Sequence, residues 1–254
     1  MTETLLKGRR IIVTGGASGM GEGLVRALPG LGAQVVSLDI NSEAGARIAT
    51  ETGTGFVSVD VASKASVTAG IDAAVGQLGG LDVLIHAAGI APGAQAEAIP
   101  LDQWDQVLAI NATGTFLTNQ AVFPHLKEKG GVILNFASSA GVKGYPNKAA
   151  YAASKGAVVA WIRSIAVEWG RYNIRVNGIA PAIWTPMYDK TRAAMAPEQL
   201  SGHEAMLKVS IPLGGKLGEI DGDLVPVVAF LASEGAHFMT GQIVPVDGGA
   251  MMMR

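Results

Sequence analysis

Short apolar runs with strand character recur along this chain, and stretches of helical patterning separate them. A strand covered by helices on both faces is apolar along its whole length, whereas a strand with one wet face alternates. The runs here are mostly continuous, which is typical of a parallel, doubly wound sheet. We therefore predict an α/β fold with helices on both faces of a seven-stranded sheet. The seven runs are residues 9–13, 34–39, 55–59, 82–86, 131–136, 173–179 and 242–246.

The composition indicates one compact domain over residues 1–254. Hydrophobic residues make up 49% of the chain and charged residues only 16%, which is ample material for a core. No stretch reads as a linker between domains, and α/β folds of this length are commonly single domains. The net charge of −2, with 19 scattered Lys and Arg, offers no basic face. We therefore expect no nucleic-acid partner.

The chain lacks the residues that several other classes of function need. It contains no cysteine, which excludes disulfides and thiol catalysis. The four histidines, His86, His125, His203 and His237, show no metal-ligand spacing, so no metal is expected. No apolar run approaches the roughly 18 residues that a membrane span requires, and no signal segment is evident. We expect a cytoplasmic protein without a membrane partner.

A glycine-rich loop follows the first predicted strand and precedes a helical pattern. Gly15, Gly19 and Gly21 are spaced so that the chain can turn tightly and approach a pyrophosphate at a helix N-terminus. The second strand ends at Asp39, where a carboxylate can accept hydrogen bonds from an adenosine ribose. Glycine-rich turns are common, and Asp39 alone could be a solvated turn residue. The order strand, glycine loop, helix, strand, acid favours a Rossmann-like dinucleotide site.

The stretch from Ser138 to Lys155 holds groups that can transfer a proton. Tyr151 and Lys155 are four residues apart in an Ala-rich helical run, so their side chains leave the same helix face. A nearby ammonium favours phenolate over phenol and lowers the pKa of the tyrosine. Ser138 follows an apolar strand and can hydrogen-bond the same substrate oxygen. Such Tyr and Lys pairs also occur on solvated helices, so the interpretation depends on the dinucleotide site.

The predicted topology brings these groups to one edge of the sheet. In doubly wound sheets, ligands bind at the carboxyl ends of the strands. Gly15, Asp39, Asp60, Gly89 and Ser138 all follow predicted strands. The longest segment without strand character, about residues 182–220, precedes the last helix and strand. We interpret it as a candidate substrate lid.

In these motifs the chain resembles the compact type of short-chain dehydrogenase/reductase over essentially its whole length. The family's T-G-x-x-x-G-x-G motif matches Thr14 to Gly21, and its Asp-Val adenine contact is similar to Asp60-Val61. Its helix asparagine matches Asn111 in INATG. Its active-site Ser, Tyr and Lys match Ser138, Tyr151 and Lys155.

The resemblance implies a role for each matched residue. Tyr151 would be the general acid–base, Ser138 would orient the substrate oxygen, and Lys155 would lower the tyrosine pKa and hold the nicotinamide ribose. Asn111 would support a water that links Lys155 to solvent. The expected cofactor-binding residues are Gly15, Ser18, Gly19, Met20, Gly21, Asp39, Ile40, Asp60, Val61, Ala88, Gly89, Tyr151, Lys155, Pro181 and Thr185.

Two segments depart from the family pattern. Residues 86–89 read HAAG where the family usually has N-N-A-G, so we expect the side-chain hydrogen bonds that tie down that strand to be partly lost or replaced, with altered local stability and no loss of activity. Residues 181–185 read PAIWT, with Ala in place of Gly and one residue fewer before the threonine. The backbone there is expected to differ, and Thr185 is the candidate contact to the nicotinamide carboxamide.

The expected cofactor is NAD. Asp39 would repel a 2′-phosphate, and its neighbours Ser18 and Ile40 carry no compensating cation. With NAD as the cofactor, the expected reaction is the oxidation of a secondary alcohol to a ketone, or the reverse. A 3-oxoacyl reductase or a sugar or polyol dehydrogenase of the same family is an alternative. A dinucleotide-binding regulator without catalysis is an alternative of another class.

The substrate pocket is expected to be mostly apolar, although these residues could equally be ordinary packing of a lid. The candidates are Ser138, Ala140, Val142, Tyr145, Trp184, Met187 and Tyr188. The helix of about residues 150–169 is apolar on more of its circumference than one sheet face can cover. We therefore expect a homo-oligomer, with a homotetramer as the first choice.

Overall fold

In the computed structural model, seven parallel strands form one sheet in the order β3-β2-β1-β4-β5-β6-β7. The structure describes residues 5–251, without the side chains of Met187 and Thr191. Since β1 pairs with both β2 and β4, the chain winds outward from the centre of the sheet in two directions. The strands are β1 (Arg10–Thr14), β2 (Gln34–Asp39), β3 (Gly55–Ser58), β4 (Val83–His86), β5 (Gly131–Phe136), β6 (Ile174–Pro181) and β7 (Ile243–Val246).

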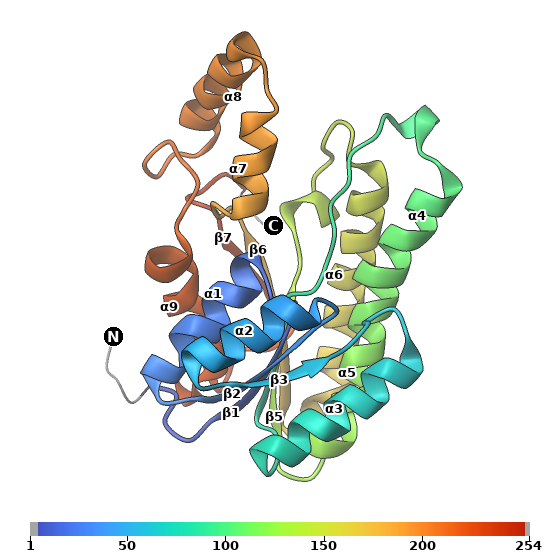
Figure 1. Ribbon diagram of the computed structural model, residues 1–254, viewed down its shortest axis with the longest axis vertical. Helices are drawn as coiled ribbons and strands as arrows, with labels where there is room; N and C mark the ends of the chain where they lie inside the picture. Colours follow the sequence, from blue (N-terminus) through green and yellow to red (C-terminus); the bar gives the residue numbers. More distant parts are fainter. Residues whose placement is uncertain (1–4, 252–254) are drawn as a thin grey trace.

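Helices cover both faces of this sheet (Figure 1). α1, α2 and α9 pack on one face, and α3, α5 and α6 pack on the other. The helices are α1 (Gly19–Ala27), α2 (Ser42–Thr52), α3 (Lys64–Leu78), α4 (Leu101–Val107), α5 (Gly114–Leu126), α6 (Ala149–Trp169), α7 (Pro186–Ala193), α8 (Pro197–Ser210) and α9 (Val225–Ala232). This arrangement confirms the predicted doubly wound α/β fold.

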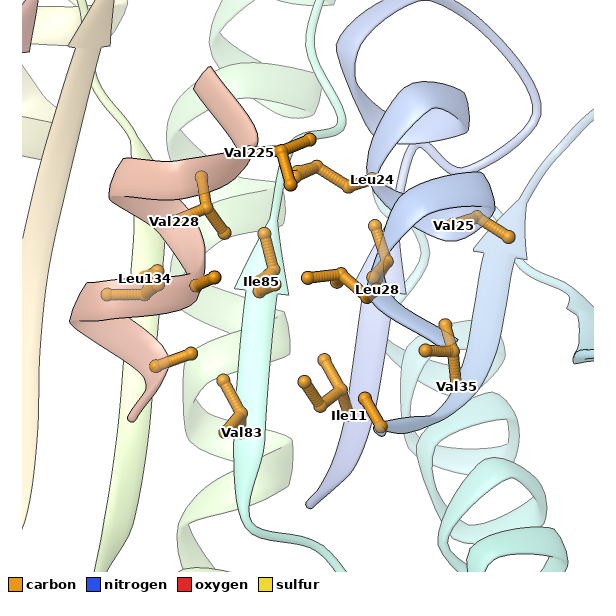
Figure 2. Packing of buried hydrophobic residues seen from close by; sticks show 14 of the residues in the cluster. Ile11, Leu24, Val25, Leu28, Val35, Val83, Ile85, Leu134, Val225 and Val228 are labelled. Atoms are coloured by element: carbon orange, nitrogen blue, oxygen red, sulfur yellow. The ribbon is translucent and has the colours of Figure 1, made fainter. Parts of the chain in front are cut away.

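The alternation of side chains along each strand produces two apolar layers. On one face, Ile11 and Ile85 of the sheet pack with Leu24 of α1 and Val228 of α9, as Figure 2 shows. On the opposite face, the next residues along the same strands pack with α3, α5 and α6, and Leu84 is one of them. Because both faces are covered, the central strands are apolar along their length, which explains the continuous runs in the sequence.

All seven predicted strands are confirmed. The largest difference is at β6, which continues to Pro181 and so carries its last residues further towards the edge of the sheet. The helix that bears the Tyr and Lys pair is also confirmed, because α6 spans Ala149–Trp169. Within residues 5–251, no helix is long and apolar enough to cross a membrane.

The predicted lid segment contains two helices, α7 and α8, which project beyond the end of the sheet (Figure 1). The segment is anchored at its base, where Ile183 bridges to Gly218 and the Trp184 N–H donates to the Gly218 carbonyl at 2.8 Å. No residue of α8 is buried, and Met206 is 55% exposed. The segment is therefore tied to the sheet at its ends and packs little in between.

Candidate active site

The candidate site lies at the carboxyl edge of the sheet, where the winding direction reverses between β1 and β4. The loops after these two strands leave towards opposite faces of the sheet, and such a switch point opens a crevice for ligands. Thr14 ends β1 and His86 ends β4, and the two are register partners. The sequence-predicted residues Asp39 and Ser138 follow from neighbouring strands at the same edge.

The glycine loop adopts a conformation that needs its glycines. Gly15 has φ +70° and Gly19 has φ +56°, values that L-residues with side chains rarely adopt. A Cβ on Gly21 would lie 2.1 Å from the Gly15 carbonyl oxygen, whereas a Cβ on Gly19 would meet no atom within 4 Å. α1 begins at Gly19, so its first amide groups have no partner within the helix. The loop therefore fits a pyrophosphate group of a dinucleotide.

Asp39 stands beside this loop. Its carboxylate accepts from the Ala17 N–H at 3.0 Å and from the Asn41 N–H at 2.9 Å. Two carboxylate oxygens offer about four acceptor positions, so acceptor capacity remains for a ribose hydroxyl. Ser18 is exposed and Ile40 is 70% exposed, and neither side chain is charged. The carboxylate is thus held in place against the glycine loop.

Asp60 and Val61 lie just past β3. The Asp60 carboxylate accepts from the Ala62 N–H at 2.9 Å, which fixes the turn. Val61 is 8% exposed, and a Cβ on Gly114 would lie 3.1 Å from Val61 Cγ2. Val61 therefore packs tightly against the start of α5. The side chain of Met20, on the other side of the loop, packs against the apolar layer of α1 and α9.

Asn111 holds the loop after β4 in place. It is fully buried in a π-helical segment, Leu108–Thr113, between α4 and α5. Its amide accepts from the Ile90 N–H and donates to the Ile90 carbonyl, both at 2.8 Å, and donates to Ser154 Oγ at 3.0 Å. The Asn111 side chain thus joins the β4 loop to α6. The water that the resemblance implies here stays a prediction.

The three acid–base candidates meet where β5 ends and α6 begins. Lys155 is 5% exposed, and its ammonium donates to the Phe136 carbonyl at 2.6 Å. The Lys155 Nζ lies 5.9 Å from the centroid of the Tyr151 ring. Ser138 follows β5, and its Oγ accepts from the Ala140 N–H at 3.1 Å. The predicted grouping of Ser138, Tyr151 and Lys155 is therefore present.

Burial dominates the acid–base properties of this group. It lowers the pKa of Lys155 to about 8, because the charged ammonium is removed from water. It also raises the pKa of Tyr151, and a hydrogen bond with Ser138 opposes that rise. The expected net lowering of the tyrosine pKa by Lys155 is therefore not seen in the protein alone. The reason is that desolvation of the phenolate outweighs the other influences.

Residues 181–185 continue the extended path of β6 beyond the end of the strand. The Ala182 N–H donates to the Val246 carbonyl at 2.9 Å, so this segment continues alongside β7. Thr185 is 9% exposed and caps α7, accepting from the Tyr188 N–H at 3.3 Å. Its hydroxyl proton remains available to donate. The contact to a carboxamide stays a prediction.

The expected substrate-pocket residues fall into two groups, one in the loop between β5 and α6 and one in the lid. Ala140 is buried, whereas Val142 is 51% and Tyr145 is 41% exposed. The Tyr145 hydroxyl lies 3.0 Å from Ser139 Oγ. On the lid side, the rings of Trp184 and Tyr188 pack edge to face, with centroids 4.9 Å apart. Met187 lies on α7, and its side chain is outside the described residues.

A polar network within the lid was missed by sequence reasoning. The Tyr188 hydroxyl lies 2.8 Å from His203 Nε2, and this contact joins α7 to α8. Arg192 forms an ion pair with Glu204, and its guanidinium lies 4.7 Å from the Trp184 ring centroid. The hydrogen-bonded and ion-paired partners are 15 and 12 residues apart and form no known motif. Nothing in the residue pattern could have identified them.

His86 was also missed as a structural anchor. It is 1% exposed, and its Nδ1 lies 2.8 Å from Thr14 Oγ1 and 3.1 Å from Thr118 Oγ1. The Ala88 N–H donates to the same Thr14 hydroxyl at 3.3 Å. These hydrogen bonds tie the HAAG segment to β1 and α5. Burial lowers the pKa of His86 to about 3.

Most of the chain matches known proteins. Residues 15–251 match the family model described as enoyl-(acyl carrier protein) reductase. The chain is 36% identical to D-threitol dehydrogenase of Mycolicibacterium smegmatis, over 96% of this chain and 93% of the relative.

Two solved structures share the fold. A levodione reductase has a TM-score of 0.87 at 34% identity, covering 96% of this chain and 97% of its own. A 3-ketoacyl-(acyl-carrier-protein) reductase from Brucella melitensis, in complex with NADH, has a TM-score of 0.86 at 32% identity, covering 97% and 100%. The sequence motifs, the sheet order, the glycine loop and these matches together lead to one conclusion: the chain belongs to the short-chain dehydrogenase/reductase family of oxidoreductases.

Proposed function

We propose that this protein is an NAD-dependent oxidoreductase that interconverts a secondary alcohol and a ketone, with Tyr151 as the general acid–base. One observation carries the proposal: Tyr151, Ser138 and Lys155 lie at the sheet edge that also holds the glycine loop and Asp39. A bound nicotinamide supplies the hydride acceptor or donor. The chain's own residues supply binding, orientation and proton transfer.

The proton moves between the substrate oxygen and the Tyr151 phenol oxygen. In alcohol oxidation, Tyr151 must be the phenolate to accept the hydroxyl proton, and in ketone reduction it must be the phenol to donate one. Ser138 hydrogen-bonds the same substrate oxygen and orients it. Because burial raises the pKa of Tyr151, its ionisation depends on the groups that surround it.

Lys155 supplies the positive charge of the site. Its ammonium is fixed by the Phe136 carbonyl, one helical turn from Tyr151 on α6. A cation in a dry pocket favours phenolate over phenol, since Coulomb interactions are stronger at low dielectric. Asn111 supports this arrangement by holding Ile90 and Ser154.

We infer that NAD is preferred over NADP. The Asp39 carboxylate lies against the glycine loop, so a 2′-phosphate on the ribose would meet a negative charge. The structure of the Brucella melitensis relative in complex with NADH is consistent with that preference. Gly15, Gly19 and Gly21 would receive the pyrophosphate, and Asp60 with Val61 would flank the adenine. Ala88, Gly89, Pro181 and Thr185 would border the nicotinamide end.

We infer that the substrate is a small alcohol or ketone with apolar substituents. Val142 and Tyr145, in the loop after Ser138, are exposed, and Trp184 at the base of the lid is half-buried. Residues 182–220 are the proposed lid over them. The printed name of the Mycolicibacterium smegmatis relative favours a second candidate, a polyol substrate. The names of the family model and of the Brucella melitensis structure support a third candidate, an acyl-carrier substrate.

The assembly that we propose is a homotetramer. The outer side of α5 and α6 carries Phe116, which is 37% exposed, and Val167, which is 84% exposed. The Phe116 ring packs edge to face with Trp161, with centroids 5.3 Å apart. A second copy of these helices would bury this surface. Light scattering that shows a monomer at micromolar concentration would contradict the assembly.

The cytoplasmic location stays a prediction.

The test is a panel of secondary alcohols and ketones, followed by absorbance of reduced nicotinamide with NAD and NADP in parallel. The proposal predicts turnover with NAD on apolar secondary alcohols, and each well-buried methylene should raise kcat/KM by up to about fourfold. If kcat/KM does not change along the series of apolar alcohols and a polyol is strongly preferred, the substrate is a polyol. Cofactor binding without turnover of any member would favour a regulator over an enzyme.

A further inference from the structure

Lys148 stands at the beginning of α6, and the proposed mechanism does not use it. Its ammonium donates to the Ala91 carbonyl in the loop after β4. The same loop passes the catalytic group, because a Cβ on Gly89 would lie 3.6 Å from the Lys155 Nζ. The Cα atoms of Gly89 and Ala91, two residues apart, are separated by at most about 7 Å. Both ammonium groups thus approach one short loop, and Lys148 borders the candidate site.

Two loops hold the Lys148 side chain. The loop between β4 and α4 lies beside the loop between β5 and α6 (Figure 1), and the Ala94 N–H donates to the Asn147 carbonyl at 3.1 Å. A Cβ on Gly93 would lie 3.3 Å from that carbonyl and 3.6 Å from the Lys148 Nζ. The Lys148 side chain is half-buried. Its ammonium is therefore fixed in position between the loops.

The surroundings of Lys148 are unfavourable for a positive charge. Burial lowers the pKa of its ammonium, and no carboxylate within residues 5–251 offsets that effect. Lys148 is also the N-cap residue of α6, a helix of 21 residues with no acidic residue in its first turn. A cation is disfavoured at this end of a helix. Charged groups that are perturbed in this way concentrate at functional sites.

Lys148 has the donors and the position to contact a substrate. The Ala91 carbonyl uses one of the three N–H groups of the ammonium. Tyr151 follows three residues later, roughly 5 Å further along the axis of α6. A substrate that contacts both side chains needs its charged group roughly 5–10 Å from the reacting carbon, or one to two helical turns. Val142 and Tyr145, in the loop before Lys148, offer apolar surface for the remainder of the molecule.

We propose that Lys148 is a specificity-determining residue whose ammonium binds a carboxylate on the substrate, at the end away from the reacting hydroxyl. This inference rests on the proposed function and narrows its substrate class to hydroxy acids or keto acids with an apolar body. The carboxylate accepts a charge-assisted hydrogen bond, which is stronger than a bond between neutral groups. It also supplies the negative charge that the half-buried ammonium lacks.

Three cyclohexanols of similar shape test this role. They carry a carboxylate, a carboxamide or a methyl group on the carbon opposite the hydroxyl. With NAD, the wild type should have its highest kcat/KM for the carboxylate. In Lys148→Met, that value should fall by roughly 10- to 100-fold, mainly through KM, because a hydrogen bond to a charged group is lost. The values for the two neutral alcohols should stay close to those of the wild type.

Two further variants serve as controls. Lys148→Arg keeps the charge and the donors, so it should keep the preference for the carboxylate. Lys143→Met removes an exposed lysine of the same loop and should change kcat/KM for none of the three alcohols.

Calorimetry with the NAD complex measures the contact without turnover. Cyclohexanecarboxylate has no hydroxyl and cannot be oxidised, so it reports binding of the carboxylate alone. It should bind to the wild type and to Lys143→Met, and about tenfold or more weakly to Lys148→Met. Cyclohexanecarboxamide should bind to all three proteins alike.

Equal losses for all three alcohols in Lys148→Met would overturn the inference, because Lys148 would then only anchor the loop at Ala91. An unchanged preference for the carboxylate in that variant would also overturn it, as would equal binding of cyclohexanecarboxylate to the wild type and Lys148→Met. Failure of the proposed function would instead appear as full turnover in Tyr151→Phe, and the calorimetric test of Lys148 does not depend on that result.

Discussion

The edge of the sheet between β1 and β4 and the projecting pair α7 and α8 both carry polar networks, but they are built differently. At the edge, Asn111 and Lys155 are nearly or fully buried, and their partners are backbone groups of the sheet and its loops together with the Ser154 hydroxyl of α6. In the lid, Tyr188 bonds to His203, and Arg192 pairs with Glu204, so the partners belong to the lid itself.

This difference indicates which region carries out proton transfer and which region admits the substrate. Groups fixed by the sheet keep their geometry to within the tolerance that proton transfer needs. A segment that bonds mainly to itself can move as a unit without breaking its internal contacts. We therefore assign proton transfer and cofactor choice to the sheet edge, and substrate admission to the lid. Single substitutions in each region test this division.

Tyr151→Phe removes the proton-transferring oxygen from the sheet edge and little else. We expect turnover to fall by roughly 10²–10⁴ or more, because general acid–base catalysis contributes on that order. NAD binding, measured by calorimetry, should persist. If this variant kept near-wild-type turnover, the chemistry would not reside at Tyr151, and the division between the two regions would lose its basis.

Lys155→Met should increase the stability of the protein near neutral pH while abolishing activity. The folded-state pKa of Lys155, about 8, lies below the value of 10.5 for an unperturbed lysine, so folding carries a penalty for a buried charge. That penalty is full below pH 8 and fades as pH rises towards the unfolded value. The free energy of unfolding should therefore rise by up to roughly 3 kcal/mol near neutral pH, and by less in alkali.

Chemical denaturation across a pH series measures this effect. Lys190→Met, at an exposed position of α7, is the matched control and should show no such pH dependence. A Lys155→Met variant that is less stable at every pH would mean that the contact with the Phe136 carbonyl outweighs the cost of burying the charge.

Asp39→Ala tests whether the sheet edge also selects the cofactor. Removal of the carboxylate removes the repulsion of a 2′-phosphate and one acceptor for the ribose. The ratio of kcat/KM for NAD over NADP should fall by about tenfold, which corresponds to about 1.4 kcal/mol. Asp72→Ala is the control, because Asp72 lies on α3 and contacts His125 of α5; it should leave the ratio unchanged. Equal use of both cofactors by the wild type would contradict the role of Asp39.

Tyr188→Phe gives the smallest expected effect and tests the lid. It removes the hydroxyl that lies 2.8 Å from His203 and leaves the ring against Trp184. Since a hydrogen bond contributes about 0.5–1.5 kcal/mol net, we expect a change of roughly twofold to tenfold, in KM rather than in kcat. Tyr172→Phe, away from the lid, is the control. A loss confined to kcat would place Tyr188 in the chemistry instead.

The sequence predicted the parts of this molecule that depend on local pattern. The strands follow from continuous apolar runs, and the Tyr151 and Lys155 pair follows from helical spacing. The hydrogen bonds of His86 could not be predicted, because its partners Thr14 and Thr118 lie 72 and 32 residues away. The same holds for Tyr188 and His203 in the lid. The direction of the Tyr151 pKa shift also depends on burial, which spacing alone does not reveal.

The pH dependence of alcohol oxidation tests the central claim, that Tyr151 is the base at the switch-point edge, most directly. The measurement is kcat/KM for one secondary alcohol over a pH series, in the wild type and in Tyr151→Phe. We expect the wild-type value to rise with pH through one ionisation, because the base must be deprotonated to accept the hydroxyl proton, and we expect this ionisation to be absent from the residual activity of Tyr151→Phe. The same ionisation in both proteins would contradict the claim.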